Sequence, residues 1–343
     1  MIEILGAALL VFLIYYIACS ATLSSRNQSI WIIFFVIASV VLRMLVPNNL
    51  NNDYYYYYKF DIFHKPSSLL SYLINEPYLY SVYAFCSLFI EEKKDIFQAM
   101  YWFNFLIDTA FFIWLILRKD VEMWKKMLLF TLHYFVFGYV LLRNGPAYIL
   151  FAMYFYYTFR NKKFTLVWLT PLLHISSCLM LVTYFHQWRH YFKALLAAPI
   201  IVFLSFLVFK PYLVSIYEFD IILSKITIYS EGIPFNSIMH VSFFVFIIVL
   251  TSLSFLLYKG KMLDPILVTT IFFYICTFFI SPIVAHRFSP YFLFALLFFP
   301  FEEIDNSKTI LVLNRYSILL LPIFIYTLFN THKTKLYVEL FMK

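Results

Sequence analysis

The chain has 343 residues, of which 63% are hydrophobic and only 13% are charged, and its mean hydropathy is +0.82. A soluble domain needs more polar surface than this composition supplies, so the numbers exclude one and indicate an integral membrane protein. The formal net charge of +8 does not indicate nucleic-acid binding. Lys and Arg lie in short stretches between apolar segments, where they report membrane topology.

Apolar segments that are long enough, or nearly long enough, to span a bilayer recur along the whole sequence. A span needs about 20 apolar residues. The first segment has no basic region before it, so it is expected to be a transmembrane helix and not a cleaved signal. The candidates are residues 4–23, 30–47, 97–117, 127–142, 145–159, 164–185, 194–217, 236–258, 265–285, 288–301 and 310–329. The expected fold is therefore all-α: a polytopic, single transmembrane domain over residues 1–343, with about ten or eleven transmembrane helices.

One apolar segment is expected to be broken. Basic clusters at residues 160–163 and 189–193 both favour the cytoplasmic side, yet the single segment 164–185 lies between them. This segment contains Pro171 followed by His174, so a re-entrant hairpin with His174 near its tip reconciles the charges. A straight, kinked helix with one positive loop outside is the alternative.

Two polar stretches, residues 48–77 and 218–235, are the longest loops and the expected functional surface. The density of Lys and Arg places the basic cluster at residues 118–126 on the cytoplasmic side. The N-terminus, the loop 48–77, a turn at Arg143 and a turn at His286 and Arg287 then fall on the outer side. Residues 78–90 form an apolar stretch too short to span, so a half-helix or interfacial helix is expected there.

Three arginines are not explained by topology. Arg43, Arg143 and Arg287 lie at or just inside the expected outer ends of apolar segments, where burial of a cation is costly unless it is paired. They can extend to the headgroups or pair with Asp53 or Glu76. Alternatively, because a guanidinium binds phosphate oxygens through two donors and stays charged, the three predict a diphosphate-binding cluster.

The outer loop supplies groups suited to sugars. Asn52, Asp53, Tyr54, Tyr57 and Glu76 combine amide and carboxylate hydrogen bonding with flat rings that stack on sugar C–H faces. The tyrosines can equally form an aromatic belt at the membrane interface. Carboxylates add nothing to membrane anchoring, so Asp53 and Glu76 are candidate catalytic groups.

His174 and Asp108 are ionisable residues within apolar segments. A buried histidine is usually bonded to a backbone or hydroxyl group, but His174, at the expected helix break, is also a candidate base. Asp108, Lys210, Asp264 and His133 are weaker candidates, and His133 and Lys210 can instead pair within the helix bundle. The sequence has no Walker A loop, GxSxG, HExxH or outer-loop DxD pair, so neither a metal nor a cofactor is expected.

Five segments occur in a fixed order over roughly residues 40 to 300: LRMLVPNNLNNDYYYYY, NEPYLYSVY, LLRNGPAYILFAMYFYY, PLLHISSCLML and IVAHRFSPYFLFALLFFP. This order and spacing resemble the EpsG-like and Wzy-type polymerases of bacterial O-antigen and exopolysaccharide assembly. One departure is that the family's Arg-Gln pair is Arg143 and Asn144 here, followed by Gly145 and Pro146.

The resemblance implies a metal-independent glycosyltransferase, with no cofactor, in the bacterial inner (cytoplasmic) membrane. It would polymerise undecaprenyl-diphosphate-linked oligosaccharide units at the periplasmic face, with membrane lipid and a chain-length regulator as partners and no nucleic acid. The expected roles are diphosphate binding by Arg43, Arg143 and Arg287, general-base catalysis by Asp53, Glu76 or His174, and sugar binding by Asn52, Tyr54 and Tyr57.

Three other functions remain open. An O-antigen ligase usually has its largest outer loop late in the chain, whereas the largest loop here is early. A membrane glycosyltransferase that uses lipid-phosphate sugars tends to carry an acidic pair in the first outer loop, where this chain has only Asp53. A lipid-linked oligosaccharide flippase or other transporter would show internal repeats, and none is found.

Overall fold

The computed structural model describes residues 2–20, 24–48, 54, 58, 72, 77–197, 238–258, 264–280, 282–300 and 307–331. Every regular element in these ranges is helical, which confirms the all-α fold class. The chain divides into two compact units. Unit 1 comprises Met1–Lys65, Tyr78–Ile149 and Asn306–Lys343, and unit 2 comprises Pro66–Pro77 and Leu150–Asp305. The expectation of a single transmembrane domain stays a prediction.

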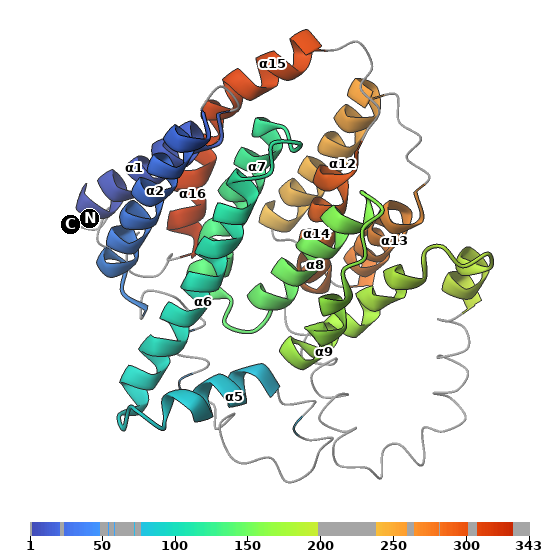
Figure 1. The fold of residues 1–343 in the computed structure, drawn as a ribbon. Coiled ribbons are helices and arrows are strands. Elements are labelled where there is room, and N and C mark those ends of the chain that lie inside the picture. Colours follow the sequence, from blue (N-terminus) through green and yellow to red (C-terminus); the bar gives the residue numbers. More distant parts are fainter. Residues whose placement is uncertain are drawn as a thin grey trace. The chain divides into compact units, whose positions relative to one another are not determined.

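Unit 1 is a bundle in which α1 packs against α2 and α7 packs against α16 (Figure 1). Residues 127–142 do not form one regular helix, because α7 passes into a π-helix, η2, before Leu141. The elements are α1 (Ile2–Ala18), α2 (Ser25–Leu45), α5 (Pro77–Cys86), α6 (Lys93–Ile116), α7 (Met123–Phe135), η2 (Val136–Val140), α15 (Ser307–Tyr316), η5 (Ser317–Leu320) and α16 (Leu321–Thr331).

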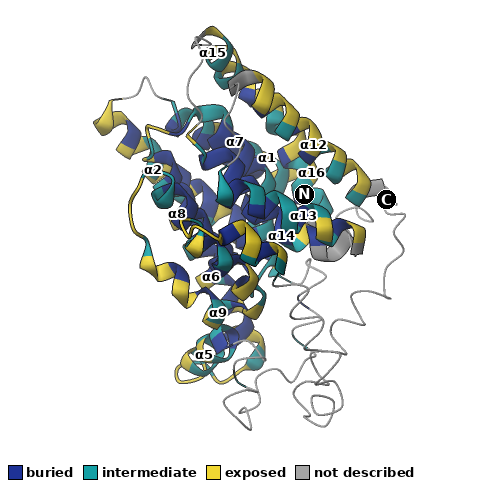
Figure 2. Ribbon diagram, turned by 90° about the vertical axis from the view of Figure 1, so that its right-hand side faces the viewer, coloured by how far each residue is buried: buried dark blue, intermediate teal, exposed yellow. Residues whose placement is uncertain are grey.

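The core of unit 1 is aromatic. The ring of Phe130 stacks on Tyr15 at a centroid distance of 3.9 Å and on Phe324 at 5.1 Å, and the edge of Phe112 meets it at 5.1 Å. All four side chains are fully buried. Figure 2 shows much of α7 in the dark blue of buried residues. Stacked and edge-to-face rings therefore hold four different helices together.

Unit 2 contains the rest of α8 (Gly145–Thr158), whose first residues belong to unit 1. Three short helical elements and three longer helices follow in the described part of the unit. These elements are η3 (Thr165–Leu169), α9 (Thr170–Leu173), η4 (Ile175–Phe185), α12 (Ile238–Tyr258), α13 (Pro265–Ile280) and α14 (Pro282–Phe298). Its core is also aromatic, with Phe151 against Tyr291 at 4.9 Å and Phe244 stacked on Phe278 at 4.2 Å.

Three of the described helical stretches are long and apolar enough to cross a membrane: Ser25–Leu45, Lys93–Ile116 and Lys308–Asn330. Four shorter apolar helices accompany them: Ile2–Ala18, Ile175–Phe185, His240–Leu256 and Pro265–Phe279. The number of spans, ten or eleven, stays a prediction. Most of segment 194–217 and of the loops 48–77 and 218–235 lies outside the described residues.

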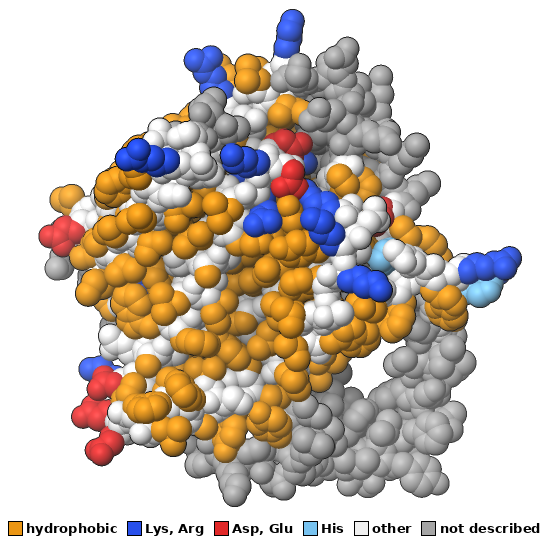
Figure 3. All heavy atoms as spheres, in the orientation of Figure 1, with side chains coloured by type: hydrophobic (Ala, Val, Ile, Leu, Met, Phe, Trp, Pro, Cys, Tyr) orange, Lys and Arg blue, Asp and Glu red, His pale blue; other side chains and the backbone are white. Residues whose placement is uncertain are grey.

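The outward face of α2 is apolar. Ile33, Phe34, Ile37 and Val41 are each about half exposed, and hydrophobic side chains cover much of the face drawn in Figure 3. In water such a surface is unfavourable, whereas in a bilayer it meets acyl chains of equal polarity. The exposed side chains therefore support a membrane environment for unit 1.

Segment 164–185 is broken at the expected residue. His174 has an extended backbone (φ −158°, ψ 122°) between α9 and η4, and Pro171 lies in the first turn of α9. The expected break is therefore present, and its re-entrant course through a membrane stays a prediction.

The expected turn at His286 and Arg287 is wrong. Both residues lie inside α14, which begins at Pro282, two residues after α13 ends at Ile280. Proline is favoured at a helix start because its fixed φ suits the first turn and its missing N–H has no partner there anyway. The proline, and not the charged pair, marks the boundary.

Candidate functional site

Arg43 is a buried cation in the last turn of α2, and only 3% of its surface is exposed. The buried face of α2 includes Phe35, Ser39, Leu42 and Arg43, which share one side of the helix at three- and four-residue spacing. Arg43 therefore points into unit 1, in line with core residues, and does not extend along the exposed face.

Aromatic rings surround the guanidinium. Its central carbon lies 4.8 Å from the ring centroid of Tyr139, 5.7 Å from that of Tyr101 and 5.8 Å from that of Trp102. The negative faces of such rings attract a desolvated cation, by about 0.5–2 kcal/mol for each good contact. Three rings thus compensate part of the free energy lost when Arg43 leaves water.

The chain that follows α2 returns to Arg43. The N–H of Val46 donates a hydrogen bond to the carbonyl of Leu42 at 3.1 Å, and Pro47 cannot continue the helix. This brings Asn48 back to the helix end, where its side-chain oxygen accepts a hydrogen bond from Nη2 of Arg43. The guanidinium is therefore held on one side by an amide and on the other by rings.

A cavity of about 670 Å³ opens beside Arg43. Such a volume is typical of ligand-binding sites. The polar and aromatic residues that line it are Arg43, Asn48, Tyr54, Lys94, Gln98 and Trp102. Two of these lining residues, Arg43 and Lys94, are cations, and they favour an anionic ligand.

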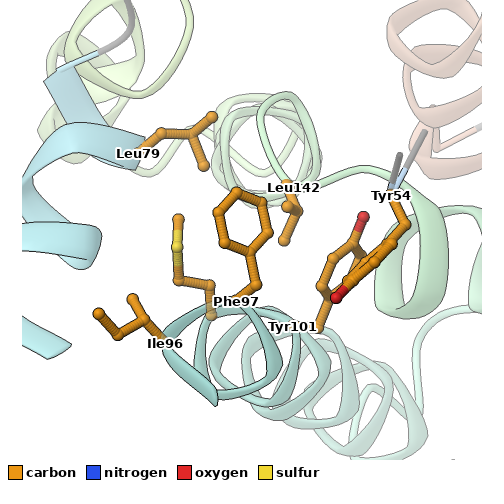
Figure 4. Close-up of a cluster of buried hydrophobic side chains, with 7 residues drawn as sticks. Tyr54, Leu79, Ile96, Phe97, Tyr101 and Leu142 are labelled. Carbon is orange, nitrogen blue, oxygen red and sulfur yellow. The ribbon is translucent and has the colours of Figure 1, made fainter. Parts of the chain in front are cut away.

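Tyr54 forms part of the wall and is 9% exposed. Its ring meets the edge of Phe97 at 6.1 Å and lies 6.0 Å from the ring of Tyr101. Figure 4 shows Tyr54 beside Tyr101, with Phe97 and Leu142 in the same cluster. Tyr54 is thus packed against α6.

Asn104 of α6 connects this helix to α5 and to the segment that follows η2. Its side-chain oxygen accepts a hydrogen bond from the hydroxyl of Tyr78, and its Nδ2 donates to the carbonyls of Leu141 at 3.1 Å and Leu142 at 2.8 Å. Burial raises the pKa of Tyr78, which keeps its hydroxyl a donor. Asn104 therefore fixes the turn that contains Arg143.

The expected site residues divide between the two units. Arg43, Tyr54 and the half-buried Arg143 belong to unit 1, where Arg43 and Tyr54 line the same cavity. Arg287 on α14 and His174 belong to unit 2. Asn52, Asp53, Tyr57 and Glu76 lie outside the described residues.

His174 is 4% exposed and engaged by its neighbour. Its Nδ1 lies 2.6 Å from the hydroxyl oxygen of Ser176 and accepts a hydrogen bond from the Ser176 N–H at 3.3 Å. These contacts cap the start of η4. They are the backbone and hydroxyl hydrogen bonds expected of a buried structural histidine.

Lys94, Gln98 and Trp102 were not anticipated. They recur every four residues on α6 and therefore share one face. The apolar segment begins at Phe97, whereas the helix begins at Lys93, so hydropathy alone hides its polar first turn. The four-residue spacing of the three side chains is the signal that would have found them.

No family model, curated protein or solved structure matches the chain. The function is therefore inferred from the residues of the site themselves.

Proposed function

We propose that this protein polymerises undecaprenyl-diphosphate-linked oligosaccharide units at the periplasmic face of the bacterial inner membrane, as a metal-independent glycosyltransferase. The observation that carries the proposal is the placement of Arg43. Its side chain is 3% exposed and lies in the last turn of an apolar helix of membrane-spanning length. It lines a cavity that a second cation, Lys94, also lines.

A diphosphate on a lipid suits this position. The polyprenyl chain stays among the apolar helices, while the phosphates lie at the membrane surface, level with the end of α2. Arg43 donates from a planar fork that matches two phosphate oxygens, and Lys94 adds a point charge. Arg143, in the turn fixed by Asn104, and Arg287 are proposed as further diphosphate ligands.

The remaining walls suit sugars. Tyr54 and Trp102 present flat rings, and Asn48 and Gln98 present amides that both donate and accept hydrogen bonds. Sugar rings combine apolar C–H faces with hydroxyl edges, so they need both kinds of group. Asn52 and Tyr57 are proposed to extend this sugar-binding surface.

The proposed reaction is transfer of the growing chain onto the incoming unit. A hydroxyl of the incoming unit attacks the anomeric carbon of the chain, a glycosidic bond forms, and the bond from that carbon to the diphosphate oxygen breaks. The diphosphate leaves with the electron pair, and the arginines stabilise its charge. The hydroxyl proton passes to a general base, for which Asp53, Glu76 and His174 are the candidates.

Deletion and complementation test this function. The gene is deleted, surface polysaccharide is separated on gels, and the strain is complemented with the wild type, Arg43→Ala or Arg26→Ala. Arg26 is the matched control because it is exposed near the start of the same helix. The proposal predicts single-unit lipid-linked material in the deletion strain, and a ladder restored by Arg26→Ala but not by Arg43→Ala.

Other outcomes contradict it. Long polymer that accumulates without attachment identifies a ligase, and lipid-linked units retained on the cytoplasmic face identify a flippase. A full ladder from Arg43→Ala at normal protein level removes the residue on which the proposal rests.

A further inference from the structure

Asp108 is a carboxyl group buried within a helix of membrane-spanning length. It lies on α6, about 22 Å from Lys93 at about 1.5 Å rise per residue, and none of its surface is exposed. An ionisable residue at such depth is unfavourable unless it has a partner, and it usually marks a functional site.

Neither oxygen of Asp108 has a hydrogen-bond partner within the described part of the chain. The titratable groups that interact with it electrostatically are Tyr15 of α1, Tyr134 of α7 and Tyr139 of η2. From α2, Arg43 interacts with Tyr134 and Tyr139.

The backbone opposite Asp108 is adapted to the carboxyl group. A Cβ added at Gly138 would lie 2.8 Å from Oδ2 of Asp108, closer than real Cβ atoms come, so any larger residue would have to displace the carboxyl oxygen. Gly138 is the middle residue of η2, and single-turn π-helices are frequent at functional sites. The π-helix thus holds a glycine against Asp108 and, at the next residue, a ring against Arg43.

We propose that Asp108 is a binding site for one monovalent cation, a proton or a sodium ion, within unit 1. One positive charge neutralises one carboxylate, and both oxygens are available for it. A Ca²⁺ ion takes six to eight oxygen ligands, several of them carboxylates. Among the described residues no group of three acidic, histidine or cysteine side chains gathers to hold such an ion. The site does not depend on the proposed polymerase activity.

Thermal unfolding of the purified, full-length protein in detergent tests the site. Ligands that bind the native state raise Tm, so removal of the cation lowers it. Tm is measured from mildly acidic to mildly alkaline pH in choline chloride, and again at alkaline pH with sodium chloride at equal ionic strength. The variants are Asp108→Asn, which keeps the shape without the charge, and Asp95→Asn, an exposed position on the same helix.

The pH series and the addition of sodium distinguish a proton from a sodium ion. If the cation is a proton, the Tm of the wild type falls by several degrees more than that of Asp108→Asn as the pH rises, and sodium does not restore it. If the cation is sodium, sodium chloride raises the Tm of the wild type at alkaline pH by several degrees and leaves Asp108→Asn unchanged. Asp95→Asn should behave as the wild type does in either arm.

The proposal is overturned if the wild type responds to neither cation, or if Asp108→Asn keeps the full response. Should Asp108→Asn give too little folded protein, Gly138→Ala serves the same comparison. Its methyl group displaces the carboxyl oxygen, so a smaller response than that of the wild type is expected, and an unchanged response contradicts the site.

Discussion

The guanidinium of Arg43 lies over the ring of Tyr139, with its central carbon 4.8 Å from the ring centroid. Arg43 lies in the last turn of α2 and Tyr139 in the π-helix η2, so this contact joins two parts of unit 1 that are far apart in the sequence. Gly138, the residue before Tyr139, faces the buried carboxyl group of Asp108. Arg43 is therefore positioned by a backbone segment that also encloses a buried acid.

The face of the Tyr139 ring, and not its hydroxyl, is expected to hold Arg43. Tyr139→Phe keeps the ring and should preserve polymer length, whereas Tyr139→Leu removes a contact worth about 1–2 kcal/mol and should weaken substrate use about tenfold. Ladder length on gels, normalised to the protein level in membranes, measures both variants. Equal ladders from the two would show that the ring has no role.

The substitution Arg43→Lys tests whether the positive charge of Arg43 or the planar shape of its guanidinium is needed for activity. Lysine keeps the positive charge but loses the planar fork and the stacking on the rings, so we expect near-normal protein levels and a loss of activity of at least about tenfold. The comparison is the rate of polymer formation in membranes that contain equal amounts of each variant. A fully active Arg43→Lys would mean that charge alone suffices.

Asn104 is expected to be a stability residue. Asn104→Leu leaves the carbonyls of Leu141 and Leu142 without their donor, at a cost of about 1–3 kcal/mol for each buried group. The Tm of the purified protein should fall by several degrees. Gln98→Leu, at an exposed position on the same helix, is the control and should leave Tm unchanged. A wild-type Tm for Asn104→Leu would contradict the role given to its hydrogen bonds.

Lys126 is buried, although it belongs to a basic cluster that the topology rule assigns to the cytoplasm. Its Nζ donates a hydrogen bond at 3.0 Å to the carbonyl of Ile116, the last residue of α6. The negative end of the helix dipole also stabilises a cation at this position. Lys126→Met should therefore lower the free energy of unfolding by about 1–3 kcal/mol, and Tm should fall with it. Lys119→Met, at an exposed position, should not. The opposite ranking of the two variants would refute this account of Lys126.

Much of the helical framework could be predicted because bilayer thickness sets the length of an apolar segment. The expected segments 30–47, 97–117 and 236–258 correspond to α2, α6 and α12 with shifts of a few residues at the ends. The ends were less accurate since a polar first turn is invisible to hydropathy, and Lys94 was overlooked for that reason. The turn placed at Arg287 was wrong because a charged pair was given more weight than Pro282.

The surroundings of Arg43 could be predicted only in part. The position of this cation at the end of an apolar segment is a property of the local sequence, and it singled the residue out. Its contacts with Tyr139 and Trp102 depend on how helices far apart in the chain pack, which no local pattern encodes. The π-helix at Gly138 was likewise hidden, since the apolar segment 127–142 has the composition of an ordinary helix.

The most direct test of the central claim is polymerisation in a purified system. The wild type, Arg43→Ala and Arg26→Ala are reconstituted in liposomes with undecaprenyl-diphosphate-linked repeat units, and the products are separated by size. The account predicts multimers on the lipid carrier with the wild type and Arg26→Ala, and unreacted single units with Arg43→Ala. Multimers from Arg43→Ala at the wild-type rate, or single units alone with the folded wild type, would contradict it.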